Sequence, residues 1–216
     1  MPRPRNGPFV RVSWISGLLS GEKSCEWAAW FRAHNFYTKR PDDFDSAGWR
    51  IKHTSLLVTV RDQFRTDGYT VTVEDQNDFK VSGAVGVLAE KPDLIAVKGD
   101  HVVVIDAKTG TPRASDTAQV MTYMRALPFA RPRQFKGLKI DGMVVYQTRQ
   151  AKILADDVDD AFRARIRSLM QRICGTAAPF TSPSVGDCRY CDISQEDCSD
   201  RAGGGIEEEI ETTNEF

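Results

Sequence analysis

A run of short strands in the middle of the chain constrains the fold most, because segments of helical period lie on both sides of it. Residues 69–74 alternate apolar and polar side chains, which predicts a half-buried strand. Residues 79–88 continue as a second strand region. Residues 93–97 and 101–107 are joined by Lys98-Gly99-Asp100, a turn sequence that predicts a β-hairpin.

The flanking segments predict helices and one further hairpin. Helices are expected at residues 13–20, 24–36, 50–66, 117–127 and 156–174, and two short strands at residues 142–148 and 152–154, with a loop at residues 37–49. Ser24 is the expected N-cap of the second helix, and Pro128 is expected to end the fourth. This order of elements predicts a layered α/β or α+β domain.

Composition places the chain among globular proteins. Its 216 residues are 41% hydrophobic and 27% charged, and a chain of this length buries a core without disulfides. The longest apolar run, residues 27–31, is far shorter than the ~20 residues of a membrane span. No apolar stretch typical of a secretory signal follows the N-terminal arginines. We therefore expect a cytoplasmic protein with no membrane partner.

The end of the chain differs from the rest in charge. Residues 206–216 carry five Glu and no Lys or Arg, and they follow three consecutive glycines, residues 203–205. The whole chain has a net charge of −1, whereas residues 1–205 have a net charge of +4. Residues 201–216 are therefore expected to form a disordered joint and acidic tail. The near-zero net charge gives no argument against a nucleic-acid partner.

Three charged residues border the predicted hairpin. Asp93 begins one strand, whereas Asp106 and Lys108 end the next and project from the same face of it. Two adjacent carboxylates repel each other unless a cation lies between them, and oxygen ligands favour Mg²⁺ or Mn²⁺. A lysine beside such an ion can orient an attacking water and stabilise charge on a phosphate. The alternative is an Asp that closes a turn and an exposed Asp–Lys pair.

The arrangement of these residues resembles a nuclease motif. The segment from Pro92-Asp93 to Asp106-Ala107-Lys108 is similar to the motif of the PD-(D/E)xK nuclease superfamily, and residues 104–110 are close to the form in RecB-like members. The resemblance implies a restriction-endonuclease-like core, in which helices flank a mixed central sheet.

Three further residues match the RecB-like pattern. Those enzymes carry Q-x3-Y on a later helix, and Gln119 and Tyr123 supply it eleven residues after the lysine. They also place a histidine at the start of an upstream helix, where this chain has His53. A lone histidine can equally have a structural role.

The resemblance implies a role for each matched residue. The implied catalytic residues are Asp93, Asp106, Lys108, Gln119 and Tyr123, and the implied ligands of Mg²⁺ or Mn²⁺ are His53, Asp93, Asp106 and the carbonyl of Ala107. Lys108 would position or activate the attacking water. Gln119 and Tyr123 would orient the DNA strand or support Lys108.

The cysteines predict a second kind of metal site. Cys188, Cys191 and Cys198 have the spacing C-x2-C-x6-C, and an odd total of five cysteines without a secretory signal makes a disulfide framework unfavourable. Thiolates select zinc or iron–sulfur clusters, and either needs a fourth ligand. The candidates are Cys25, Cys174 and a histidine.

The region of Cys25 resembles the N-terminal cysteine segment of RecB-like nucleases that carry an iron–sulfur cluster. These include the CRISPR-associated exonucleases and the AddB-type helicase–nuclease subunits. The resemblance implies a 4Fe–4S cluster on Cys25, Cys188, Cys191 and Cys198, with a structural Zn²⁺ on the same residues as the alternative. It also implies one nuclease domain, residues 12–200, in which residues 12–50 and 175–200 form a helical subdomain around the cluster.

Together these features predict a metal-dependent DNA nuclease. The resemblance implies an exonuclease that hydrolyses phosphodiester bonds of single-stranded DNA or single-stranded ends, in DNA processing, repair, recombination or CRISPR-type defence. A helicase or a defence complex is then the expected protein partner. The alternative is a catalytically silent DNA-binding or scaffold subunit with the same fold. The intact set of Asp93, Asp106 and Lys108 argues against that alternative.

Overall fold

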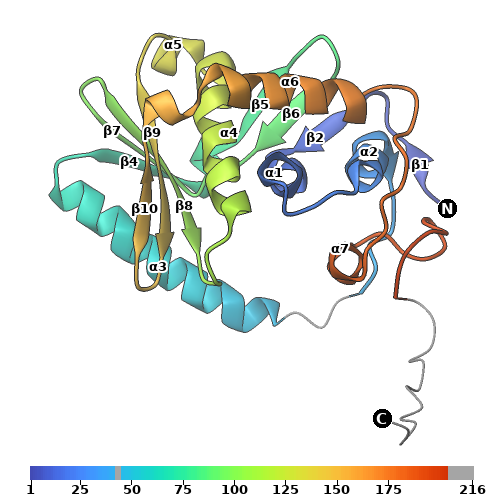
Figure 1. Ribbon diagram of the computed structural model, residues 1–216. Coiled ribbons are helices and arrows are strands. Elements are labelled where there is room, and N and C mark those ends of the chain that lie inside the picture. The colour runs from blue at the N-terminus through green and yellow to red at the C-terminus, as the bar shows by residue number, and fades with distance from the viewer. Residues whose placement is uncertain (42–44, 204–216) are drawn as a thin grey trace, which may run out of the picture.

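A computed structural model describes residues 1–41 and 45–203 (Figure 1). Except for residues 201–203, the predicted acidic tail lies outside the described residues. Within the described ranges, no helix combines the length and the apolar character that crossing a lipid bilayer requires.

A five-stranded sheet forms the centre of the molecule, in the order β10-β9-β8-β7-β4. Its strands are β4 (Thr70–Val73), β7 (Leu94–Lys98), β8 (His101–Lys108), β9 (Ile140–Tyr146) and β10 (Gln150–Ile153). The central strand β8 pairs antiparallel with β7 and parallel with β9, so the sheet is mixed. Both predicted hairpins, β7–β8 and β9–β10, are confirmed.

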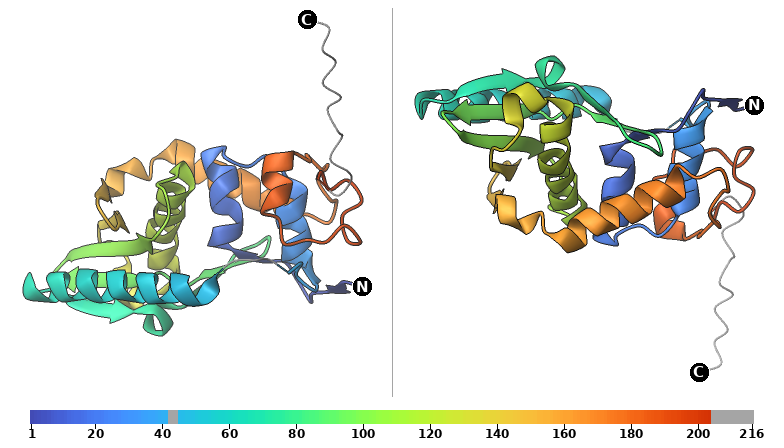
Figure 2. Two further views of the ribbon diagram at one scale, coloured as in Figure 1. Left: turned by 90° about the horizontal axis from the view of Figure 1, so that it is seen from below. Right: turned by 90° about the horizontal axis from the view of Figure 1, so that it is seen from above.

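Helices cover both faces of this sheet (Figure 2). The long helix α3 (Ser46–Thr66) lies on one face, and α4 (Ala114–Ala130) packs on β8 and β9 from the other. The short helix α5 (Pro132–Phe135) follows α4, and α6 (Asp160–Ile173) packs beside α4 and the N-terminal helices.

Alternate residues of β8 divide the hydrophobic core in two. Val102 and Val104 belong to the cluster beneath α4, whereas Val103 and Ile105 belong to the cluster beneath α3. This alternation is the period of a strand buried on both faces. It fixes the face on which every later residue of β8 lies.

The two ends of the chain form a second part of the molecule, at the right of Figure 1. Its helices are α1 (Val12–Ser20), α2 (Glu26–His34) and α7 (Val185–Arg189), and its strands are β1 (Arg3–Pro4), β2 (Phe9–Arg11) and β3 (Asn35–Phe36). From the middle of the chain, β5 (Phe79–Ser82) and β6 (Val87–Glu90) join β2 in a three-stranded sheet. Arg32 on α2 forms an ion pair of 2.8 Å with Asp192, so the chain ends are in direct contact.

Several local expectations are wrong, including the loop at residues 37–49, because α3 already begins at Ser46, where Asp45 caps it. Helix α4 continues through Pro128 to Ala130: the proline removes one helical hydrogen bond, but Arg131 N still donates to Leu127 O at 2.9 Å. Helix α6 begins at Asp160 rather than at residue 156, because Asp159 caps it by accepting from Phe162 N at 2.7 Å. The N-cap of α2 is Cys25 rather than Ser24.

Candidate active site

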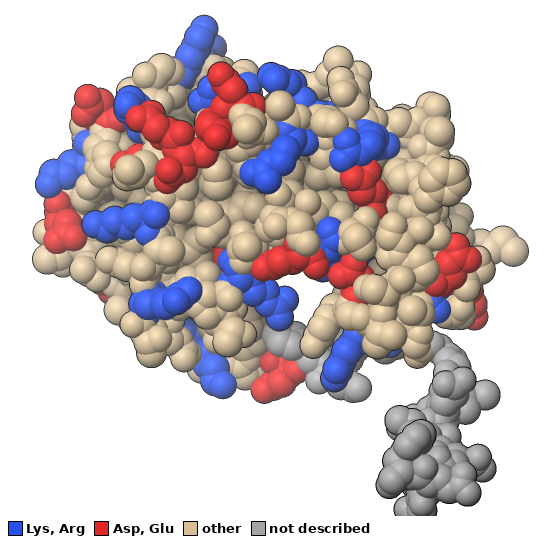
Figure 3. All heavy atoms as spheres, viewed as in Figure 1, with Lys and Arg blue, Asp and Glu red and all other residues tan. Residues whose placement is uncertain are grey.

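All seven residues of the predicted nuclease site line one open pocket of about 490 Å³ at the end of β8. They are His53, Asp93, Asp106, Ala107, Lys108, Gln119 and Tyr123. In the view of Figure 3, the surface is hollowed at the lower centre, beneath the end of β8 in Figure 1, and both positive and negative side chains border the hollow. The structure thus brings the predicted residues together, while their catalytic roles stay predictions.

The sheet register places the two aspartates side by side. Leu94 on β7 pairs with Ile105 on β8, so Asp93 and Asp106 are the next residues outward on the two strands. Asp106 and Lys108 follow Val104 on the α4 face of the sheet. The Oδ2 atom of Asp93 accepts a hydrogen bond of 2.8 Å from the backbone N of Ala107, which fixes the Asp93 side chain across the two strands.

Asp106 is a buried carboxylate at the floor of the pocket. Its side chain is 5% exposed, and its Oδ2 lies 2.7 Å from Lys108 Nζ. Within the described ranges, that oxygen receives no hydrogen bond of good geometry. Burial raises the pKa of Asp106 from 3.8 to about 6, and the nearby Asp93 adds to the rise while Lys108 opposes it. The carboxylate therefore needs more positive charge than Lys108 supplies.

Lys108 is held by two partners. Besides Asp106, its Nζ donates a hydrogen bond of 3.1 Å to Gln119 Oε1. Burial lowers the pKa of Lys108, but the Asp106 carboxylate outweighs burial and raises the pKa above its ordinary value. Lys108 is therefore a cation at neutral pH, suited to donate hydrogen bonds rather than to accept a proton.

Gln119 links the acidic and basic residues of the pocket from helix α4. Its Nε2 donates to Asp106 Oδ1 at 3.2 Å and to Tyr123 Oη at 2.5 Å. Tyr123 is one helical turn further along and only 1% exposed, so its contact is with Gln119 rather than with solvent. Of the two predicted roles for this pair, the geometry favours support of Lys108.

His53 reaches the pocket from the opposite side of the sheet, on helix α3. Its Nε2 lies 3.3 Å from Asp93 Oδ2. This hydrogen bond raises the pKa of His53 above its ordinary value, against the lowering effect of burial. The ring also stacks on Trp49, with centroids 4.7 Å apart. The histidine thus lies beside the first aspartate of the motif.

Several pocket residues were not predicted from the sequence. They are Ser13, Trp49, Glu74, Glu90, Lys91, Thr109 and Gly110. Thr109 and Gly110 directly follow Lys108, and Glu74 ends the predicted strand at residues 69–74. Their places in the sequence therefore indicated that they could lie near the pocket. There was no such indication for Ser13 and Glu90, because their contact joins residues 77 positions apart.

The donor atoms fit a hard divalent cation, although their present arrangement is not that of a metal site. Among residues 1–41 and 45–203, no three His, Cys, Asp or Glu side chains are arranged to hold a metal ion. In this arrangement His53 Nε2 bonds Asp93 Oδ2, and Lys108 Nζ contacts Asp106 Oδ2. An ion would compete with the protein's own donors for these oxygens. Oxygen-rich ligand sets select Mg²⁺ or Mn²⁺.

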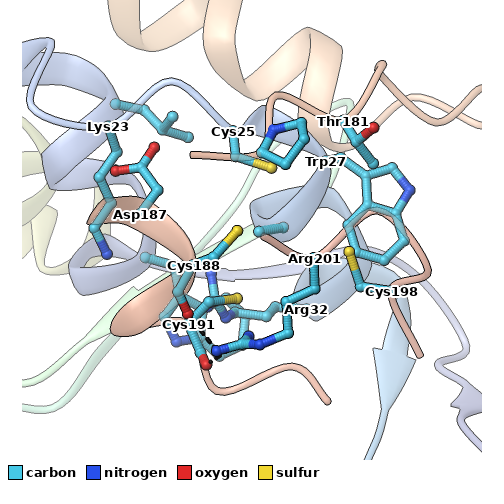
Figure 4. Close-up of a pocket in the computed structure, with 14 residues that line it drawn as sticks. Lys23, Cys25, Trp27, Arg32, Thr181, Asp187, Cys188, Cys191, Cys198 and Arg201 are labelled. Carbon is cyan, nitrogen blue, oxygen red and sulfur yellow. Dashed lines mark hydrogen bonds between the residues drawn. The ribbon is translucent and has the colours of Figure 1, made fainter. Parts of the chain in front are cut away.

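The four cysteines of the second predicted site line one separate cavity of about 40 Å³. Figure 4 shows the sulfur atoms of Cys25, Cys188, Cys191 and Cys198 on the walls of this cavity. Cys25 comes from the start of α2, and the others from α7 and the loop after it. The fifth cysteine, Cys174, lies elsewhere, against Gly86.

Hydrogen-bond donors surround these sulfurs. Arg32 Nη2 lies 3.5 Å from Cys191 Sγ, and the backbone N of Ala202 lies 3.4 Å from Cys188 Sγ. Burial raises the pKa of the Cys198 thiol, and the three neighbouring cysteines add to the rise. Thiolates are ligands of soft metal groups, but within residues 1–41 and 45–203 no three of these sulfurs are arranged to hold a metal ion.

One comparison with known proteins, a family model, agrees with the nuclease motif. A family model described as "PD-(D/E)XK nuclease superfamily" matches residues 19–195. No curated protein sequence matches the chain. Among solved structures, the crystal structure of SSO0001 is similar, with 17% sequence identity and a TM-score of 0.45, over 88% of this chain and 85% of that chain.

Proposed function

The chain belongs to the PD-(D/E)XK nuclease superfamily, and on this premise we propose that it is a metal-dependent DNA nuclease whose active site is the pocket at the end of β8. The observation that carries the proposal is the connected set of Asp93, Asp106, Lys108 and Gln119 in that pocket. A surface ion pair would not need a buried carboxylate and an aligned glutamine.

The proposed reaction is hydrolysis of a phosphodiester bond. Asp93 and Asp106 would hold the cation, with His53 and the Ala107 carbonyl as further ligands. When bound, Mg²⁺ or Mn²⁺ supplies a Lewis acid that polarises the phosphate and lowers the pKa of a bound water. Lys108 stays protonated, so it would orient the water and stabilise the negative charge that develops on the phosphate.

Gln119 keeps Lys108 in place for this role. Its carbonyl accepts from Lys108, and its amide donates to Asp106 and Tyr123, which fixes the amide orientation. Because Tyr123 is buried, it would act through Gln119 and not on the DNA. These two residues are positioning residues in the proposed mechanism.

The finer proposal is a RecB-like exonuclease that acts on single-stranded DNA or single-stranded ends, alongside a helicase or a defence complex. The support is the motif order, with His53 before the strands and Gln119 and Tyr123 after them. The shared cavity of Cys25 with the three C-terminal cysteines supports a 4Fe–4S cluster that joins the ends of the chain, with Zn²⁺ as the competing occupant. Either group would have a structural role.

Incubation of the purified chain with labelled single- and double-stranded DNA and Mn²⁺ tests the function. Wild type is expected to release nucleotides from single strands, and EDTA to stop the reaction. Asp106→Ala is expected to lower the rate by about 10²-fold or more. Asp141→Ala is the matched control, because Asp141 lies on the adjacent strand β9 outside the pocket.

Two results would contradict the proposal. Equal cleavage by wild type and Asp106→Ala would exclude the pocket as the active site. DNA binding without cleavage by wild type, under the same conditions, would instead favour the silent DNA-binding subunit.

A further inference from the structure

Glu74 has an unusual backbone in the wall of the same pocket. It is the one non-glycine residue with a positive φ among residues 1–41 and 45–203, at +31°. A left-handed backbone costs a residue with a side chain free energy, and such residues persist where the surrounding structure enforces them, often at functional sites. Glu74 lies directly after β4, where η1 (Glu74–Asn77) begins.

The sheet register continues to Glu74. Val73 on β4 pairs with Leu94 on β7, and the next residues also pair, because Glu74 N donates to Asp93 O at 2.9 Å. Asp93 in turn neighbours Asp106 on β8. Three carboxylate residues, Glu74, Asp93 and Asp106, therefore lie next to one another at the same end of the neighbouring strands β4, β7 and β8.

A buried asparagine enforces the turn that carries Glu74. Asn77 is fully buried, and its Nδ2 donates to Pro92 O and Asp93 O at 3.1 and 3.3 Å. Its Oδ1 accepts from Thr72 Oγ1 at 2.6 Å. One side chain thus joins the end of β4 to the Pro92-Asp93 segment. The backbone of Glu74 is held at a fixed place beside Asp93.

The carboxylate of Glu74 is available to a ligand. It is exposed to the pocket and makes no hydrogen bond or ion pair with a described residue. Glu90, the other glutamate of the pocket, differs: its Oε2 accepts from Ser13 N and Ser13 Oγ, and its Oε1 pairs with Arg11 at 3.0 Å. Of the two, only Glu74 can bind an ion without breaking a structural contact.

We propose that Glu74 is a further ligand of the divalent cation, which it contacts directly or through a bound water on the β4 side of Asp93. The inference rests on the proposed function and extends its ligand set from two strands to three. A second observation points the same way: Asp106, in the same pocket, has a side chain only 5% exposed, and its Oδ2 receives no hydrogen bond of good geometry within the described ranges. The site therefore has more negative charge than its own lysine neutralises.

Titration of the metal-free full-length chain with Mn²⁺, followed by the electron paramagnetic resonance signal of free Mn²⁺, tests this proposal without an activity assay. Thiols compete poorly for this hard ion. Glu74→Gln is expected to weaken Mn²⁺ binding by about 10-fold. Asp75→Asn is the matched control, since it removes the same charge from the next residue, whose side chain pairs with Lys91 and is not part of the pocket lining. It is expected to change the affinity by less than about twofold.

Two further variants separate the possible outcomes. Glu74→Gly removes the carboxylate and adopts the positive φ without strain, so it is expected to keep the wild-type melting temperature and to bind Mn²⁺ as weakly as Glu74→Gln. Asp106→Ala is expected to abolish binding. Equal affinities for Glu74→Gln and Asp75→Asn, with binding still lost in Asp106→Ala, would overturn the role of Glu74 alone. Wild-type affinity in Asp106→Ala would overturn the proposed cation site itself.

Discussion

The residues of the pocket show how burial and a shared partner change an ordinary Asp–Lys pair. An exposed pair contributes little and needs no partner. Here Asp106 and Lys108 are both largely buried, and Gln119 contacts both of them. The lysine is therefore held in one position with its charge retained.

Removal of Gln119 tests this positioning role. In Gln119→Leu, Lys108 loses one of its two partners, and we expect kcat to fall by about 10²-fold with little change in KM, because small displacements of a positioned group have effects of that size. Steady-state kinetics on single-stranded DNA measures this split. An equal fall in Gln134→Leu, a glutamine of α5 outside the pocket, would contradict it.

The pH dependence of stability follows from Asp106. Its pKa is raised on folding from 3.8 to about 6, so the folded state favours the protonated carboxyl. Relative to high pH, protonated Asp106 stabilises the folded state, and this stabilisation is fully present below about pH 4. It is lost as the pH rises through about 6, where the buried carboxyl ionises. Without added divalent cations, we expect the free energy of unfolding of wild type to fall by a few kcal/mol relative to that of Asp106→Asn as the pH rises from about 4 to above about 6.

Urea unfolding at a series of pH values measures that difference. Addition of Mn²⁺ is expected to remove the pH dependence, because the cation stabilises the ionised carboxylate. Parallel pH profiles for wild type and Asp106→Asn would show that Asp106 does not titrate in this range.

At the residue scale, the sequence identified the pocket residues that belong to short motifs. Asp93, Asp106 and Lys108 are marked by their places at strand ends, which local patterns predict. Glu74 was passed over because its importance depends on a positive φ and on the long-range contacts of Asn77. Neither property has a local signature.

At the scale of elements, the position of Gln119 depends on how closely α4 approaches the sheet. A Cβ added to Gly142 on β9 would lie 2.5 Å from Val120 Cγ1 and 2.7 Å from Met124 Sδ. The glycine thus allows α4 to pack directly on β9. Val120 is adjacent to Gln119, so the same contact sets the height of Gln119 above Asp106.

Gly142→Ala is expected to displace α4 from the sheet. Overpacking at such a site destabilises a protein by about 1–3 kcal/mol, and the shift of Gln119 is expected to lower kcat as well. Gly186→Ala, on α7 with open space around it, is the control and should leave both quantities unchanged. Urea unfolding and steady-state kinetics provide the two readouts. Wild-type values for Gly142→Ala would show that this contact does not position α4.

Elements with a strong local signal were predicted, and those built by distant pairing were not. The β7–β8 hairpin follows from two apolar runs and a glycine turn, and it formed as expected. The parallel pairing of β2 with β6 joins residues 9–11 to residues 87–89, and no local pattern indicates it. The end of α4 was misplaced because the helix continues past Pro128 to Ala130, although a proline removes one helical hydrogen bond.

At the scale of the whole molecule, the two ends of the chain meet around the cysteine cavity. A group bound by Cys25 and by Cys188 closes a loop of about 160 residues, and closing a long loop lowers the entropy of the unfolded chain. From the residues alone, the sequence left Cys25, Cys174 and a histidine as fourth ligand. The choice of Cys25 came from the family resemblance, and the structure places Cys25 at the cavity.

Replacement of Cys25 tests whether a group bound by this residue joins the two ends of the chain. Anaerobically purified wild type is expected to be brown, with broad visible absorbance, and Cys25→Ala to lose the colour and unfold at a lower temperature. Cys174→Ala is the control: it deletes a buried thiol remote from the cavity and should keep the colour. If wild type is colourless and contains one zinc, the bound group is Zn²⁺ and not an iron–sulfur cluster. If Cys25→Ala keeps the wild-type colour, Cys25 is not a ligand of the cluster.

A comparison of two lysines tests most directly whether the pocket at the end of β8 cleaves DNA. Lys108 and Lys91 line the same pocket, but Lys108 contacts Asp106 whereas Lys91 pairs with Asp75. The measurement is the initial rate of Mn²⁺-dependent cleavage of labelled single-stranded DNA. We predict that Lys108→Ala lowers this rate by about 10²-fold or more and that Lys91→Ala leaves it within a few-fold of wild type. Equal rates for wild type and Lys108→Ala would contradict the assignment.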